Sequence, residues 1–131
     1  MANTDYYVSF VAAETITEYA LVSVNDAGKI TITTAANEDN CIGVAQRACN
    51  TGDTVEVIVY GCSRAIAGDT IAPATMNLLM ATTAGKLVPF DGATSKYAVA
   101  RMIPNINQAG ASNGDQIKVV FTGPVNLTQI S

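Results

Sequence analysis

The chain has 131 residues and a mass of 13.6 kDa, which suits one domain. Lys and Arg number 7 against 11 Asp and Glu, so the formal net charge is -4. No nucleic-acid partner is expected, because phosphate contacts require clustered basic side chains. The sequence contains no histidine, which excludes histidine-based catalytic triads and most catalytic zinc sites.

The composition favours β-structure. Val, Ile and Thr supply 39 residues and Leu only 5, and side chains branched at Cβ pack well on a pleated sheet. Charged residues make up 14% of the chain, against about 25% in typical soluble proteins. We therefore expect part of the surface to be covered in an oligomer or by a larger partner. A monomer coated with Thr, Asn and Ser is the alternative.

The N-terminal segment, residues 1–13, precedes every repeated feature of the sequence. It contains Tyr6, Tyr7 and Phe10. One interpretation is an extra strand packed on the domain. The other is an extended arm that pairs with the sheet edge of a neighbouring molecule, where backbone hydrogen bonds give affinity and aromatic side chains anchor it.

The first half of the remaining chain predicts strands at 20–24, 29–34, 41–46 and 54–60, with turns at 25–28 and 50–53. The second half predicts strands at 78–81, 86–90, 97–102 and 116–122, and a short helical turn is an alternative within 72–80. The tail 124–131 is expected to be extended or loosely ordered.

Four sequence landmarks occur twice in the same order, which indicates an internal duplication. The matched segments are 14–16 with 69–71, 27–30 with 84–87, 43–45 with 98–100, and 52–61 with 114–123. We therefore predict a single β domain over 14–123, built from pseudo-repeats 14–61 and 69–123.

The last strand of each repeat shows how the sheet is buried. One face carries Val55, Val57 and Val59, and the opposite face carries Ile58 between polar neighbours. An apolar residue on the outer face predicts that both faces are partly covered. The predicted fold class is all-β: a small β-barrel or sandwich made of two fused copies of a β-meander, with an extended N-terminal arm.

The three cysteines, Cys41, Cys49 and Cys62, do not have the spacing of a zinc site. In a chain without a signal peptide they are expected to be reduced and buried as small apolar residues. A Cys41–Cys49 disulfide across a hairpin is the alternative.

No catalytic motif is present, so the chain is not expected to be an enzyme. The acidic pairs Glu14 with Glu18 and Glu38 with Asp39 are interpreted as solvated loop charge. A weak calcium site in the Asn-Glu-Asp-Asn run at 37–40 is the less favoured alternative, because that run lacks the ligand spacing of a known loop. We predict no catalytic residue, no cofactor and no metal.

No segment approaches the roughly 18 consecutive apolar residues of a membrane helix, so no membrane partner is expected. The first 14 residues lack the basic and apolar segments of a signal peptide. Synthesis in a cytoplasm is therefore expected.

Three strings, Tyr19–Val22, Ile42–Ala45 and Gly52–Gly61, followed by a weaker second copy, resemble the capsid decoration or cement proteins, the head-stabilising proteins of tailed phages such as lambda. The resemblance extends over about 14–123. It implies a non-enzymatic virion protein, made in the host cytoplasm, that binds the outer surface of the assembled capsid and stabilises the head against packaged DNA.

The resemblance also implies a homotrimer that contacts the major capsid protein through an N-terminal arm. The capsid-binding residues expected on that basis are Thr4, Tyr6, Tyr7, Val8 and Phe10. The alternative function is a carbohydrate-binding or adhesin-like module of a virion appendage, such as a head fibre, although the chain has no Trp to form an aromatic platform for sugars.

Overall fold

A computed structural model describes residues 6–34, 40–71, 78–89, 98–103 and 111–125. Within them the chain forms strands and one short 3-10 turn, η2 (Thr83–Gly85), and the all-β prediction is confirmed. The strands are β1 (Tyr6–Val11), β2 (Leu21–Val24), β3 (Ile30–Ile32), β4 (Cys41–Ala45), β5 (Thr54–Ile66), β6 (Leu78–Ala81), β7 (Leu87–Pro89), β8 (Ala98–Met102) and β9 (Gln116–Val125).

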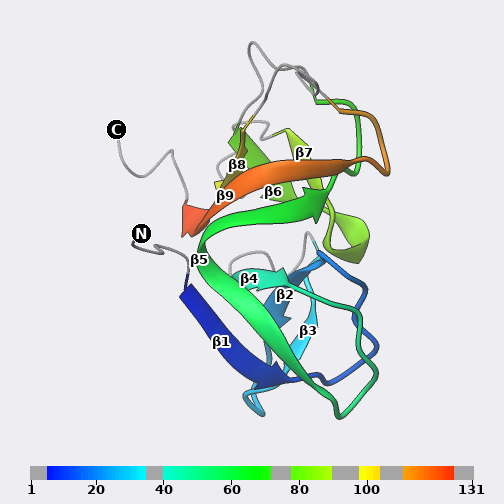
Figure 1. Cartoon of the computed structure of the whole chain (residues 1–131), viewed down its shortest axis with the longest axis vertical. Helices are drawn as coiled ribbons and strands as arrows, with labels where there is room; N and C mark the ends of the chain where they lie inside the picture. The colour runs from blue at the N-terminus through cyan, green and yellow to red at the C-terminus, as the bar shows by residue number, and fades with distance from the viewer. Residues whose placement is uncertain (1–5, 35–39, 72–77, 90–97, 104–110, 126–131) are drawn as a thin grey trace.

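The strands form one antiparallel sheet in the order β3-β2-β4-β5-β9-β8-β6-β7, with β1 paired to β5 off this path. The sheet bends into two stacked halves (Figure 1), and β5 runs through both. The start of β5 pairs with β1 and β4, and its end, from Gly61 to Ile66, pairs with β9. One long strand therefore joins the two halves.

Each half curls until its first strand meets its hairpin. After β1, Ala12 forms a parallel bridge with Ile30 of β3, and Ala67 at the end of β5 does the same with Leu87 of β7. The next amide continues the contact: Ala13 N donates to Ile30 O at 2.8 Å, and Gly68 N donates to Leu87 O at 2.7 Å. Each half is thus a small, partly open barrel.

The same backbone hydrogen bonds recur in both halves. Ala12 N donates to Asp53 O at 2.9 Å, and Ala67 N donates to Asp115 O at 2.8 Å. A register shift between Val22 and Ser23 has its counterpart between Leu79 and Met80. By these bonds, the end of β5 corresponds to β1, and β9 corresponds to the start of β5.

The register corrects one landmark of the duplication. Leu21 pairs with Val44, and Leu78 pairs with Arg101. Residues 43–45 therefore correspond to 100–102, and the predicted match to 98–100 is two residues off. Gly-Val-Ala and Ala-Val-Ala look alike as letters, but hydrogen-bond partners decide the alignment.

All eight predicted strands are present, with shifts at their ends. The largest difference is β5, which continues from Tyr60 to Ile66. The Gly-Cys-Ser-Arg run there has little β propensity; it is held as a strand by pairing with β9, and it buries Ser63 and Ala65. Likewise β9 extends to Val125, so the predicted tail begins inside a strand.

The N-terminal segment follows the first interpretation, an extra strand. Residues 6–11 pair with β5 over the whole of β1, from Tyr6 opposite Tyr60 to Val11 opposite Thr54. The extended arm predicted over 1–13 is therefore wrong for these residues, and the sheet begins at Tyr6 instead of Glu14. The reason is that this segment completes the first half, as the end of β5 completes the second.

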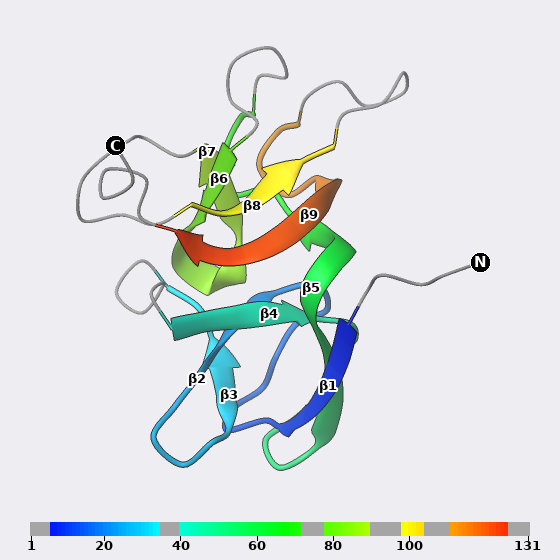
Figure 2. The same cartoon turned by 90° about the vertical axis from the view of Figure 1, so that its left-hand side faces the viewer.

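Two apolar clusters form the core. Val55 and Val57 of β5 are buried in the first half, and Phe121 of β9 is buried in the second. The second cluster also includes Leu21 and Val44, from the outer face of β2 and β4. The first half therefore closes the core of the second, and Figure 2 shows η2 and β9 lying over β2 and β4.

None of the three cysteines forms a disulfide: Cys41 and Cys49 are buried, and Cys62 is exposed. The alternative of a Cys41–Cys49 disulfide is not formed, and the expectation of burial is wrong for Cys62, which lies on the outer face of β5. Several predictions fall outside the described residues: Thr4, the pair Glu38 and Asp39, positions 72–77 of the helical turn considered within 72–80, and the tail over 126–131. Residues 78–80 belong to β6, so the helical alternative is wrong there.

Candidate functional site

Three exposed tyrosines, Tyr6, Tyr7 and Tyr60, form an aromatic cluster where β1 meets the middle of β5. Their side chains are 61%, 54% and 52% exposed. The ring centroids of Tyr6 and Tyr60 are 6.2 Å apart at an interplanar angle of 52°, a tilted contact of the kind aromatic pairs favour. Because aromatic side chains are enriched at protein interfaces, this cluster is the candidate binding site.

A register shift in the sheet produces this cluster. Tyr6 lies opposite Tyr60, but Tyr7 lies opposite Ile58, so Val59 is the extra residue on β5. Residues directly opposite in an antiparallel pair share one face of the sheet. The two consecutive tyrosines therefore both align with outer-face positions of β5, which a regular strand would not allow.

The other predicted contact residues are placed differently. Phe10 is half-buried and packs on the core of the first half, opposite Val55. Val8 lies opposite Val57 and remains 44% exposed. Phe10 therefore anchors β1 to its own domain, whereas Tyr6 and Tyr7 are presented to solvent.

The alternation of residues along 54–60 puts Tyr60 on the same outer face as Ile58, but it does not join Tyr60 to the N-terminus. The signal available was its alternation with buried valines. The contact with Tyr6 depends on a pairing between segments more than fifty residues apart, which alternation does not specify.

No strand of the described residues covers the outer edge of β1, which we call its open edge. Along Tyr6–Val11, β5 is the one strand that pairs with β1 among the residues that the structure describes. A free edge leaves alternate backbone N–H and C=O groups for another chain. The aromatic cluster and this edge lie on the same strand.

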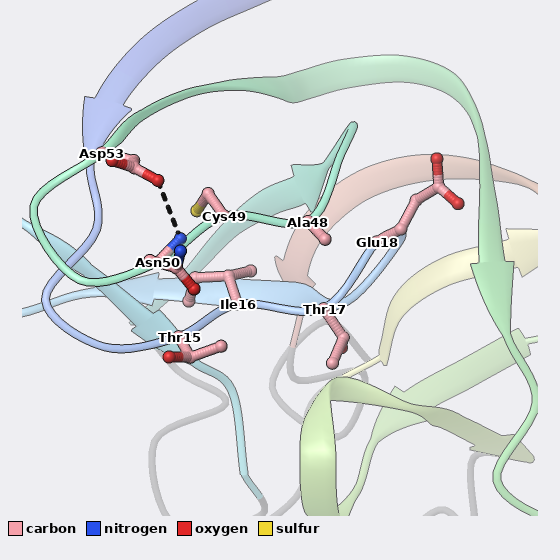
Figure 3. Close-up of a pocket in the computed structure, with 8 residues that line it drawn as sticks. All are labelled: Thr15, Ile16, Thr17, Glu18, Ala48, Cys49, Asn50 and Asp53. Carbon is pink, nitrogen blue, oxygen red and sulfur yellow. Dashed lines mark hydrogen bonds between the residues drawn. The ribbon is translucent and has the colours of Figure 1, made fainter.

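A depression of about 480 Å³ lies elsewhere on the first half, between the segments around Ile16 and Cys49 (Figure 3). Its two carboxylates, Asp53 and Glu18, lie at opposite ends of it. Asp53 Oδ2 accepts a hydrogen bond from Asn50 N at 3.0 Å.

The second half contains the same turn, in which Asp115 Oδ2 accepts from Ser112 N at 2.9 Å. The hydrogen bond of Asp53 thus belongs to a turn that both halves share, and it does not indicate a ligand.

Among the acidic side chains interpreted as solvated loop charge, Glu14 has a structural partner. Glu14 Oε2 accepts from Ile32 N at 2.8 Å and so covers the edge of β3. In the part of the chain that the structure covers, no group of three His, Cys, Asp or Glu side chains is placed to hold a metal ion. No helix in that part is long and apolar enough to cross a membrane.

Comparison with known proteins gives a fold and no family. No protein-family model matches the chain, and no curated protein matches it. Among solved structures, it is similar to the N base of the head fiber gp8.5 in bacteriophage phi29, with a TM-score of 0.65 and 19% sequence identity. The likeness covers 93% of this chain and 98% of that chain, so the two share a fold over nearly their whole length.

Proposed function

We propose that the chain is a non-enzymatic structural protein of a phage head, of the appendage type, held on the particle by the aromatic cluster. The observation that carries this proposal is the fold shared with the N base of a head fiber over 98% of that base. Because the likeness covers nearly all of both chains, they share a complete fold and not only a local motif.

The described geometry supports attachment better than chemistry. The exposed aromatic cluster and the open edge of β1 are features of a binding surface, and Glu14 and Asp53 of the first half bond to backbone amides. The proposed partner is the major capsid protein, and the proposed location is the outer surface of the capsid.

We also propose that the chain acts as a homotrimer. An oligomer that contacts several capsid subunits at once gains avidity without one tight contact. Stabilisation of the head against packaged DNA, as in a cement protein, is the narrower form of this function. The 14% charge content favours such a covered state over a free monomer.

The direct test is binding to purified heads of the phage that carries the gene. A triple variant, Tyr6→Ser with Tyr7→Ser and Tyr60→Ser, removes the aromatic cluster. Its expected effect is a loss of head binding of at least tenfold, with an unchanged circular dichroism spectrum. Unchanged binding would show that the cluster is not the attachment site.

A matched control is Asp26→Ser with Lys29→Ser, which alters the exposed 25–28 turn and leaves the net charge as it is. It should bind heads like the natural chain. Deleting residues 1–10 is a poorer test, because it also removes Phe10 from the core and unpairs one edge of β5.

Three further measurements separate the narrower roles. Light scattering on the free protein and on protein released from heads should give the mass of three chains, and a single chain in both states contradicts the homotrimer. Heads stripped of the protein should rupture at lower temperature if it acts as a cement. A fiber base would leave that temperature unchanged.

Hits on a glycan array that the triple variant loses would instead support the adhesin alternative.

A further inference from the structure

The outer face of the second half is uncovered at the positions where the first half is covered. In the first half, Leu21, Val44 and Ile58 are 0%, 0% and 2% exposed, and Leu21 and Val44 pack into the core of the second half. Their counterparts by pairing are Leu78, Arg101 and Val120. Leu78 is 40% exposed, Arg101 is exposed and Val120 is half-buried.

Three cations lie on this uncovered face, and we name them the cationic patch: Arg64, Arg101 and Lys118. Arg64 of β5 lies directly opposite Lys118 of β9, and all three side chains are exposed. Arg101 of β8 lies opposite Val120, two residues along β9 from Lys118. Like charges directly opposite across a strand pair destabilise the sheet, so folding alone does not favour this arrangement.

No carboxylate neutralises the patch within the described ranges. The ion pair found there joins Arg47 to Glu56 in the first half. Only 7 basic residues occur in a chain of net charge -4, so three on one face is a clear segregation of charge. Arg64 and Lys118 also line a depression of about 250 Å³ together with Cys62 and Ser63.

The first half serves as an internal control for the fold. Ser9 and Glu56 occupy the positions that Arg64 and Lys118 occupy in the second half, because Ser9 pairs with Glu56 as Arg64 pairs with Lys118. The same strand pairing therefore forms without cations at these positions. Their presence in the second half is a property of its surface and not a requirement of its backbone.

We infer that the cationic patch docks a carboxylate-rich protein surface, with Leu78 and Val120 as the apolar part of the contact. This rests on the proposed function, which supplies a large protein partner, and it names the chemistry of that partner. Arginine and lysine on a partly apolar face suit carboxylates, which guanidinium groups bind in paired hydrogen bonds.

Other anionic partners fit this surface less well. Three cations on an acidic protein fall short of the roughly six to ten phosphate contacts of a typical nucleic-acid binder. A glycan site favours aromatic platforms, but the exposed aromatic side chains of the described residues lie at Tyr6, Tyr7 and Tyr60.

The cationic patch and the aromatic cluster both include exposed residues of β5. Tyr60 and Arg64 are four residues apart on β5 and both are exposed; because β5 bends between them, they lie at most about 13 Å apart. Tyrosine and arginine together are typical of the centre of protein interfaces. A partner that covers the cluster can therefore reach the patch as well.

The test measures binding of the full chain to poly-L-glutamate at low salt. A triple variant, Arg64→Gln with Arg101→Gln and Lys118→Gln, should bind at least tenfold more weakly. A control with the same change in charge, Arg47→Gln with Lys29→Gln and Lys86→Gln, should bind within twofold of the natural chain. Raising the salt should remove the difference, because exposed charges are screened.

Three results would overturn the inference. The natural chain fails to bind poly-L-glutamate, the two triple variants bind alike, or a DNA oligonucleotide or heparin binds more tightly than poly-L-glutamate. If the natural chain does not bind poly-L-glutamate and the patch variant self-associates, the cations serve only to keep copies of the chain apart. Because this assay needs no phage head, its failure is distinguishable from failure of the aromatic cluster to hold the chain on heads.

Discussion

The two halves share one backbone plan but differ in what covers their outer faces. Leu21 and Val44 in the first half are buried against the second half, whereas Leu78 and Arg101 at the matching positions are uncovered. In the first half, these outer-face positions are therefore buried by packing inside the molecule. Its exposed aromatic side chains lie beside the open edge of β1. The second half presents a charged face. Duplication supplies the scaffold, and position in the chain decides which surface remains free.

The core of the second half should be the more sensitive to truncation. Phe121 is 1% exposed, and its counterpart Val59 is half-buried. Phe121→Ala should lower the free energy of unfolding by about 3–5 kcal/mol, because it leaves a large cavity. Val59→Ala should cost roughly 1 kcal/mol, since it removes little area that is fully buried. Urea denaturation measures both, and equal losses would contradict the difference between the halves.

The close approach of β4 to β5 requires glycine at Gly43, whereas the matching position in β8 is Ala100. A Cβ on Gly43 would collide with Ile58 O and lie 2.5 Å from Val57 Cγ1. Gly43→Ala should therefore cost about 1–3 kcal/mol of stability, since backbone must shift. The reverse change at the matching position, Ala100→Gly, should cost about 0.5–1 kcal/mol through backbone entropy. A neutral Gly43→Ala in thermal or urea unfolding would refute the close approach of β4 and β5.

Two matched glycines isolate the contact between the halves. Gly28 and Gly85 have φ of +78° and +71°, but a Cβ on Gly28 meets nothing within 4 Å. On Gly85 it would lie 2.9 Å from Leu21 O. Each change to Ala costs about 1–2 kcal/mol for the left-handed backbone, and Gly85→Ala should cost about 1 kcal/mol more. The same loss at both positions in paired unfolding curves would mean that η2 does not press on β2.

The smallest expected effects concern surface charge. Glu56 pairs with Arg47 at 3.1 Å, with both side chains about half exposed, whereas its counterpart Lys118 faces Arg64. Glu56→Gln should lower stability by about 0.2–1 kcal/mol, and Arg64→Ser should raise it by a similar or smaller amount. Both effects should fade in high salt. A loss of stability from Arg64→Ser would show that Arg64 packs on the sheet and is not repelled there.

The sequence was most informative where burial and alternation agree. Val55 and Val57 alternate with polar residues and were placed correctly on the buried face, and the apolar Ile58 among them correctly predicted that the outer face is covered. It was least informative at Gly61–Ile66 and Tyr6–Val11. Residues 62–66 have little β propensity and lie between the two predicted repeats, and Tyr6–Val11 precedes them, so neither segment was assigned to the duplicated unit.

The candidate site was predictable only in part. Tyr6 and Tyr7 were identified as exposed anchors, but Phe10 packs inward and Tyr60 joins the cluster through a shift in strand register. The cationic patch had no signal in the sequence, since Arg64, Arg101 and Lys118 are far apart along the chain. Hydrogen bonding between strands decides which residues become neighbours across the sheet. The local periodicity of the sequence does not specify that pairing.

By itself, the sequence determined the strands, their turns and the existence of two similar units, because side-chain alternation and turn residues act over a few neighbouring positions. Only the tertiary structure decided that β1 belongs to the first unit, that β5 serves both, and that one outer face is buried while its counterpart is free. Those outcomes depend on which strands meet after the chain has closed on itself, and a strand edge can satisfy its backbone groups with any partner that the fold brings alongside.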